Sequence, residues 1–295
     1  MNNRYDKLVF EAEKGINFEV SEETSERKLI IRAITANVYS ENYMNPPIPE
    51  GYKHVCGEWN NGFVIERRSD GSQFVWIPVG SLDYDATLDA NHYDVRFGRR
   101  NYCNDKFEND EVCGDSKREL MAQFKSVIKY GGFYISRYNI SKSPKGKPQS
   151  VKGGKPIEVN RIDAKKIAAT IEDTEAVKSH LTFGAEYDSV LAWFIKSEAK
   201  TVKEIAEDST NWGNYRNTEN APKAVVETGS CEKWCVNNIY DFAGNVREWT
   251  QETRLYGIVR GGDYGACGNN LPVACRNECY CHDIYVGFRA ALYIK

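Results

Sequence analysis

Apolar and aromatic residues gather in short runs that predict buried strands. One run is Gln73-Phe-Val-Trp-Ile-Pro-Val and another is Gly131-Gly-Phe-Tyr-Ile-Ser-Arg-Tyr-Asn-Ile, and both are rich in β-branched and aromatic side chains. Between them, residues 81–114 carry many Asp, Asn, Arg and Gly without periodicity, which is typical of a long loop. The pattern therefore predicts two core strands joined through an extended insertion.

Helical spacing of apolar residues occurs in three places, Lys117–Lys129, Asn160–Ile171 and Thr182–Ser197. From Thr201 onward the sequence predicts short, turn-rich elements. No strand–helix–strand alternation recurs, so the pattern favours an α+β fold over a doubly wound sheet.

The first 45 residues alternate short apolar stretches with acidic turns, which predicts a small β-rich module. Three closely spaced prolines then interrupt regular structure: Pro46, Pro47 and Pro49. We place a boundary there, with a module at 1–45 that serves attachment or oligomerisation and a principal domain at 46–295.

Composition narrows the functional classes. Apolar residues make up 41% and charged residues 27%, and no run approaches the roughly 18 apolar residues of a membrane span, so no membrane insertion is expected. A net charge of -3 provides no basic field for nucleic acid. The polar start at Met1 lacks the features of a secretory signal, so we expect a cytoplasmic location when the protein is made.

Several segments match, in order, the signatures of a known family across residues 73–295. They are Phe74-Val-Trp-Ile-Pro-Val, Gly132-Phe-Tyr-Ile-Ser-Arg-Tyr-Asn-Ile-Ser, Asn238-Ile-Tyr-Asp-Phe-Ala-Gly-Asn-Val-Arg-Glu-Trp-Thr, Val259-Arg-Gly-Gly and Val286-Gly-Phe-Arg. Together they resemble the formylglycine-generating-enzyme family. The resemblance implies a C-type-lectin-like fold of that subclass. Asn139 departs from a position near which a Glu is common, and Arg247 replaces an aromatic residue at what should be a tolerant, exposed position.

The resemblance also implies a calcium site at Asp241, Gly244, Val246 and Glu248. Carboxylates alternating with backbone carbonyls at a glycine turn are ligands that suit calcium. Here Asp241 takes the place of a neutral side-chain ligand. The alternative is that both carboxylates are satisfied by backbone amides. No other cofactor is expected.

The oxidase members of the family bind copper through two cysteines set five residues apart after the Arg-Gly-Gly signature. Here Cys267 falls one residue late and Cys275 follows eight residues on, so the pair is not reproduced. The related iron-dependent sulfoxide synthases need three grouped histidines, whereas the histidines here are scattered: His54, His92, His180 and His282. We therefore expect no catalysis, with a copper-dependent oxidase as the alternative.

The chain has nine cysteines, an odd number that does not suggest a regular disulfide framework. Cys275, Cys279, Cys281 and His282 provide thiolate and imidazole groups that suit zinc, but their spacing lacks the usual C-x2-C knuckle. A local disulfide among these cysteines is a further alternative.

Residues 263–285 have an unusual composition, with no Lys, Gln, Met or Trp and a single Glu. An NNC codon cannot encode these five types, and NNC results when the adenines of an AAC codon are randomised. Twenty-two of the 23 residues are reachable in this way. Diversity-generating retroelements mutate such codons, and their variable proteins resemble this family, with the altered positions just before a fixed Gly-Phe-Arg. The alternative is a surface loop that has drifted.

We thus predict a ligand- or receptor-binding variable protein, plausibly encoded by a phage or prophage and carried on the virion. Tyrosines would provide rigid contacts and Asn and Asp adaptable hydrogen bonds. The partner would be a protein or cell-surface ligand, and a purely structural virion protein is a third interpretation. The candidate binding residues are Asp263, Tyr264, Gly265, Ala266, Cys267, Asn269, Asn270, Leu271, Cys275, Asn277, Glu278, Cys279, Tyr280, Cys281, His282, Asp283, Ile284 and Tyr285.

Overall fold

The computed structural model describes residues 16–23, 28–35, 41–81, 102–103, 109–110, 114–280 and 286–295. The chain divides into two compact units, Met1–Tyr39 and Ser40–Lys295. The described residues of the first unit form one antiparallel hairpin of β1 (Ile16–Glu23) and β2 (Lys28–Thr35). The division lies close to the predicted boundary after residue 45, and a role of this module in attachment or oligomerisation stays a prediction.

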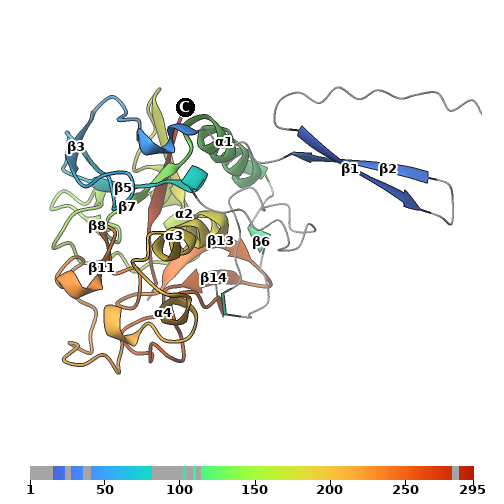
Figure 1. Ribbon diagram of the computed structural model, residues 1–295. Coiled ribbons are helices and arrows are strands. Elements are labelled where there is room, and N and C mark those ends of the chain that lie inside the picture. The colour runs from blue at the N-terminus through green and yellow to red at the C-terminus, as the bar shows by residue number, and fades with distance from the viewer. Residues whose placement is uncertain are drawn as a thin grey trace, which may run out of the picture. The chain divides into compact units, whose positions relative to one another are not determined.

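A six-stranded antiparallel sheet organises the larger unit, in the order β10-β17-β7-β5-β4-β3 (Figure 1). Both predicted apolar runs form its middle, where nearly every side chain of β5 and β7 is buried. Burial on both faces explains why these runs are continuously apolar and do not alternate. The strands are β3 (Tyr52–Cys56), β4 (Val64–Arg67), β5 (Gln73–Ile77), β7 (Phe133–Ser136), β10 (Val177–Leu181) and β17 (Ala290–Ile294).

A second sheet has the order β15-β14-β13-β16, and β6 (Asn109–Asp110) also pairs with β13. Its only parallel pairing among the described strands joins β13 to β16. The strands are β13 (Glu248–Thr253), β14 (Gly257–Arg260), β15 (Asn277–Cys279) and β16 (Gly287–Phe288). This sheet therefore contains parts of three predicted signature segments.

The three predicted helices are present as α1 (Gly114–Tyr130), α2 (Arg161–Ala169) and α3 (Gly184–Lys196), followed by the short α4 (Val202–Ala206). Asn160 caps α2, because its side-chain oxygen accepts a hydrogen bond from the Asp163 amide at 2.9 Å. In Figure 1, α4 and the loops around it lie at the opposite side of this unit from α1.

Short elements complete the unit. Two small antiparallel ladders pair β8 (Ser141–Lys142) with β9 (Pro148–Gln149) and β11 (Cys235–Val236) with β12 (Ile239–Tyr240). The 3-10 turns are η1 (Glu41–Met44), η2 (Val79–Ser81), η4 (Thr210–Trp212) and η5 (Glu232–Trp234). The fold is thus α+β with several antiparallel sheets, as predicted. None of the described helices combines the length and apolar character that a membrane crossing requires.

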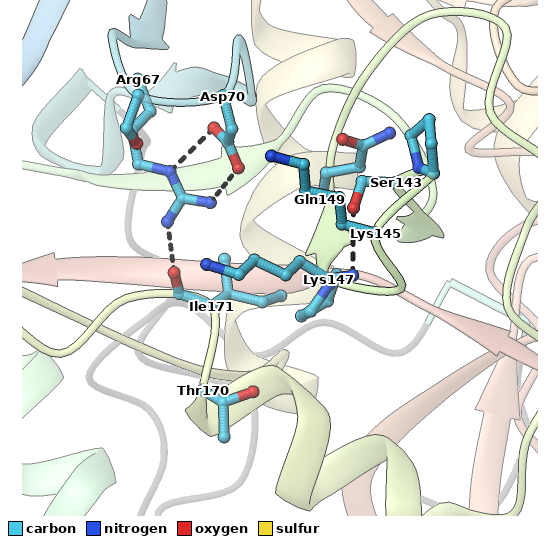
Figure 2. Close-up of a pocket in the computed structure, with 11 residues that line it drawn as sticks. Arg67, Asp70, Ser143, Lys145, Lys147, Gln149, Thr170 and Ile171 are labelled. Atoms are coloured by element: carbon cyan, nitrogen blue, oxygen red, sulfur yellow. Dashed lines mark hydrogen bonds and ion pairs between the residues drawn. The ribbon is translucent and has the colours of Figure 1, made fainter.

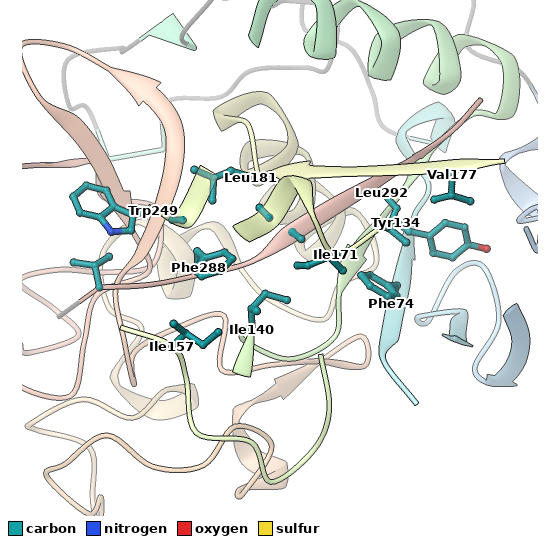
Figure 3. Packing of buried hydrophobic residues seen from close by; sticks show 14 of the residues in the cluster. Phe74, Tyr134, Ile140, Ile157, Ile171, Val177, Leu181, Trp249, Phe288 and Leu292 are labelled. Carbon is teal, nitrogen blue, oxygen red and sulfur yellow. The ribbon is translucent and has the colours of Figure 1, made fainter. Parts of the chain in front are cut away.

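One hydrophobic core joins the two sheets (Figure 3). Phe74 and Tyr134 come from the large sheet, whereas Trp249 and Phe288 come from the second sheet, and all four are buried. Ile171, at the end of α2, packs into the same cluster. The loops between the strands of the second sheet are therefore attached to the same hydrophobic core as the large sheet.

Candidate binding surface

A buried cluster of four charged side chains lies beneath the predicted variable segment. Arg260 at the end of β14 contacts Asp188 of α3 at 3.0 Å and Glu252 of β13 at 2.9 Å. Arg276, just before β15, contacts the same two carboxylates at 2.9 Å each. All four side chains are at most 1% exposed. Two cations thus neutralise two anions in the interior, as buried charges require.

The cluster explains the Arg-Gly-Gly signature. Burial alone would lower the pKa of Arg260, but the carboxylates of Glu252 and Asp188 raise it, so the side chain stays charged. Gly261 and Gly262 follow with φ values of 93° and 70°, which side-chain-bearing residues rarely adopt. The signature is therefore an anchor followed by a sharp change of chain direction into the variable segment.

Backbone contacts attach the segment to residues 205–217. The Ser209 amide donates to the Gly268 carbonyl at 3.1 Å, and the Arg216 amide donates to the Ala266 carbonyl at 2.8 Å. Further along, the Ala274 amide donates to the Ile205 carbonyl at 3.2 Å. Contacts made through the backbone hold the loop in place whatever side chains it carries.

The candidate positions and the residues between them differ in burial. All described candidates are exposed or partly exposed except Cys279, which is buried, contrary to our expectation for a binding residue. The described residues of the segment outside the candidate set are all buried: Gly268, Pro272, Val273, Ala274 and Arg276. Cys281, His282, Asp283, Ile284 and Tyr285 lie outside the described residues.

Apolar and aromatic side chains are exposed at one edge of this surface. Tyr280 is 62% exposed, and its ring lies 4.4 Å, centroid to centroid, from that of Tyr256 in the turn between β13 and β14. Leu255 in the same turn is 84% exposed. Glu278 fixes the turn, because one of its carboxylate oxygens accepts hydrogen bonds from the amides of Leu255 and Tyr256 at 2.8 and 2.9 Å. Sequence reasoning missed this turn as part of the surface.

Asp263 shapes the other end of the segment. Its carboxylate accepts hydrogen bonds from the amides of Gly265 and Ala266 at 2.7 and 3.0 Å, which closes a tight local turn. The other oxygen contacts Arg247 at 2.9 Å. Arg247, expected at a tolerant, exposed position, has a side chain that is 33% exposed. Its charge therefore meets the variable segment directly.

The Gly-Phe-Arg signature is likewise structural. Phe288 lies in the core, and buried Arg289 contacts Glu248 at 2.8 Å and donates to the carbonyls of Ser136 and Arg137 at 3.1 Å each. One guanidinium thus ties the C-terminal strand to β7 and β13.

Two of the four predicted calcium ligands, Asp241 and Glu248, are buried and interact with this arginine. One oxygen of Glu248 is held by Arg289 and by the Asn139 amide group, and one oxygen of Asp241 accepts hydrogen bonds from the Thr228 hydroxyl and the Gly229 amide, both at 2.8 Å. The second oxygen of Asp241 is buried without a hydrogen-bond donor, and burial raises the pKa of both carboxyls. The residues fit calcium in part: Asp241 offers a free oxygen, whereas Glu248 already has a cationic partner.

Cys56, Cys231, Cys235 and Cys267 are free thiols. Cys267 lies 3.1 Å from the Arg216 guanidinium, and Cys275 lies 3.3 Å, sulfur to sulfur, from Cys103. Nothing in the sequence pointed to this second contact. In the part of the chain that the structure describes, no group of three or more His, Cys, Asp or Glu side chains could hold a metal. The zinc and disulfide alternatives involve Cys281 and His282, which are not described.

Comparisons with known proteins gave no family. No protein-family model and no curated protein sequence matches the chain. Among solved structures, "Crystal Structure of CarF" has a TM-score of 0.40 and 15% identity, covering 56% of this chain and 87% of that one. "Treponema denticola variable protein 1" has a TM-score of 0.29 and 11% identity, covering 81% of this chain and 98% of that one. Likeness at this level does not establish a shared fold.

Proposed function

We propose that this protein binds a ligand without catalysis, through a surface formed by residues 263–285 whose exposed side chains are diversified in the gene. The split in burial within that segment carries the proposal. Candidate positions reach solvent, with Cys279 as the exception among those described, whereas Gly268, Pro272–Ala274 and Arg276 are buried.

Physical chemistry favours this use of the surface. A change at an exposed loop position typically alters stability by within about 0.5 kcal/mol, so many side chains are tolerated on one backbone. Tyr264 and Tyr280 offer large contacts with few rotatable bonds, and Asn269 and Asn270 offer hydrogen bonds in either direction. The expected partner is a protein or a cell-surface ligand.

We also propose that the larger unit is a C-type-lectin-like domain of the formylglycine-generating-enzyme type, used on a phage virion. Its signatures act here as supports: Arg260 and Arg289 are both buried in ion pairs. The two cysteines nearest to the oxidase positions have different neighbours, since Cys267 contacts Arg216 and Cys275 contacts Cys103. The close thiols of Cys103 and Cys275 are a pair that copper(I) could also bind, so the copper titration below decides between a scaffold and an oxidase.

The direct test is to sequence many copies of the gene from one population, together with its neighbourhood. We expect a nearby reverse transcriptase with a near-identical template repeat, and variation opposite its AAC codons at the exposed candidate positions other than Glu278. No variation is expected at the buried codons for Gly268, Pro272–Ala274 and Arg276. Variation spread equally over buried and exposed codons, or no variation and no template, would contradict diversification.

The absence of catalysis has its own test. Copper(I) is titrated into the purified protein, and oxidation of a peptide thiol is then followed. Stoichiometric copper(I) binding with turnover would contradict the proposal and support the copper-dependent oxidase. No turnover with wild type, and the same result for Cys267→Ser, is the expected outcome.

Calcium binding at Asp241 is part of the proposal. A buried carboxylate oxygen without a donor is a group that a cation stabilises. Added Ca²⁺ should raise the midpoint of thermal unfolding of the wild type but not of Asp241→Asn, whereas Mg²⁺ should have less effect on either. Equal midpoints of wild type in Ca²⁺ and in a chelator would exclude the site.

For the N-terminal module we propose attachment or oligomerisation. Light scattering coupled to size-exclusion chromatography compares the full chain with a chain lacking residues 1–45. A lower number of subunits is expected for the shortened chain, and an unchanged number would count against oligomerisation.

A further inference from the structure

A cavity separate from the candidate binding surface lies between the turn after β4, the turn between β8 and β9, and the end of α2. Its volume is about 690 Å³, within the range of small-molecule sites. Figure 2 shows Arg67 and Asp70 on one wall and the side chains of Lys145 and Lys147 reaching across from the other. None of its lining residues belongs to the variable segment.

The first wall has one cation, Arg67, which is paired with two carboxylates, Asp70 and Glu172. Arg67 contacts both oxygens of Asp70, and it also contacts Glu172 at 3.1 Å and donates to the Ile171 carbonyl. Asp70 further accepts from the amide and hydroxyl of Ser72 at 3.0 and 3.1 Å. These contacts hold the pKa of Asp70 below its usual value, even though burial alone would raise it. The Asp70 carboxylate is therefore satisfied without a lysine.

The opposite wall carries uncompensated positive charge. A tight turn fixes it, because the Ser143 amide donates to the Lys147 carbonyl and the Gly146 amide donates to the Ser143 carbonyl, both at 2.8 Å. The turn also includes the hydrogen bond from the Lys147 amide to the Ser143 hydroxyl at 3.0 Å. Among the described residues, neither Lys145 nor Lys147 has a side-chain ion pair.

We propose that this cavity binds a small phosphate monoester, such as a sugar phosphate. Two ammonium groups match the charge of a phosphate dianion, and lysine binds phosphate as a point charge. The rest of the cavity offers polar groups for hydroxyls and an apolar floor: Ser69, Ser143, Gln149, Thr170, Pro144 and Pro148. A volume several times that of a phosphate ion leaves room for the organic part of the ligand.

Calorimetric titration of the full chain tests the proposal with three probes, inorganic phosphate, glucose 6-phosphate and glucose. We expect glucose 6-phosphate to bind most tightly, inorganic phosphate more weakly and glucose not at all. Replacing both lysines, Lys145→Ala with Lys147→Ala, should weaken glucose 6-phosphate binding at least about tenfold. The control is Lys142→Ala, an exposed lysine of β8 outside the cavity lining, which should change affinity by less than about twofold.

Each other outcome overturns part or all of the proposal. No saturation by either phosphate probe below about 10 mM would exclude the site, since binding that weak has no functional content. Equal affinities for wild type and the double variant would place binding elsewhere. Equal affinities for inorganic phosphate and glucose 6-phosphate would show that the cavity recognises the phosphate group alone and not an organic part. The proposed function of residues 263–285 does not depend on any of these results.

Discussion

Two sets of residues alternate within one stretch of chain, and they differ in what they contact. Gly268, Val273 and Arg276 are buried, whereas Asn269, Asn270 and Glu278 reach solvent. The buried set fixes the path of the backbone. Most of the exposed set could differ without moving the backbone. Asp263 and Glu278 are exceptions, because their carboxylates accept hydrogen bonds from backbone amides. Positions that fix the backbone and positions that reach solvent thus lie side by side in one segment.

Arg276 shows the contrast most sharply. Its guanidinium contacts Asp188 and Glu252 in the interior, while Cys275 and Asn277 on either side are partly exposed. A segment held at only its two ends would shift when its side chains change. A buried ion pair near its middle prevents this, because moving the loop would separate charges in a medium that solvates them poorly.

The largest expected effect comes from breaking this anchor. Arg276→Ala leaves Asp188 and Glu252 with one cationic partner in place of two, so the free energy of unfolding should fall by about 3–5 kcal/mol. Chemical denaturation followed by tryptophan fluorescence measures the change. Asn277→Ala, next in the chain, should change stability by less than about 0.5 kcal/mol. Similar losses for both variants would show that burial does not separate the two sets.

A pair of glycines gives the next largest effect. A Cβ added at Gly268 would lie 2.5 Å from the Thr210 nitrogen and 2.7 Å from its Cα, and the backbone there cannot move away cheaply. At Gly265 the nearest atom is the end of the Asp263 side chain at 3.1 Å. Gly268→Ala should therefore cost about 1–3 kcal/mol in the same unfolding measurement.

Gly265→Ala is the matched control for that substitution, since it makes the same chemical change at an exposed position of the same loop. Its effect should lie within about 0.5 kcal/mol. A small loss for Gly268→Ala would mean that the loop relaxes, and that backbone contacts with residues 205–217 do not fix its path.

The sequence predicted most of what depends on local pattern. The apolar runs predicted β5 and β7, and the apolar spacing within 182–197 predicted α3, because elements buried in the core are rich in apolar residues. That residues 263–285 form a binding surface stays a prediction, made from their composition and from the family resemblance.

The sequence pattern did not predict the ion pairs between residues that are far apart in the chain. Asp188 and Glu252 lie in a helix and a strand where charged residues usually face water, so nothing marked them as partners of Arg260 and Arg276. Pairing of this kind depends on the folded path, which periodicity does not encode. Cys279 was placed on the surface for a related reason, because composition alone does not separate the two faces of a strand.

A smaller effect on stability, one that depends on pH, should distinguish the arginine cluster from a second buried pair, His180 and Glu186. His180 is 1% exposed and lies 2.9 Å from the Glu186 carboxylate. Burial alone would lower the pKa of His180, but the charge and hydrogen bond of Glu186 raise it above the ordinary 6.5, with Glu119 adding to the rise and Lys178 opposing it.

The sign of the pH effect follows from that direction. The stabilisation is complete below pH 6.5 and is lost as pH rises through the higher folded pKa, so wild type should gain stability when pH is lowered from about 9 to about 6.5. His180→Gln should remove this part of the slope. Arg276→Ala should keep it, because an arginine does not titrate in this range. An unchanged slope in His180→Gln would contradict the assignment.

The smallest effects are expected at the exposed positions themselves, and they provide the strictest test of the contrast. Tyr264→Ala, Asn269→Ala and Asn270→Ala should each change the free energy of unfolding by within about 0.5 kcal/mol. Tyr280→Ala should be the largest of the set, because its ring lies 4.4 Å from that of Tyr256 and aromatic pairs add about 0.5–1.5 kcal/mol, reduced here by exposure to water. In a combined variant, the stability changes of substitutions at sites that are far apart should add. A combined variant that loses much more than the sum would show that the exposed side chains support one another, and that the backbone beneath them does not hold its shape alone.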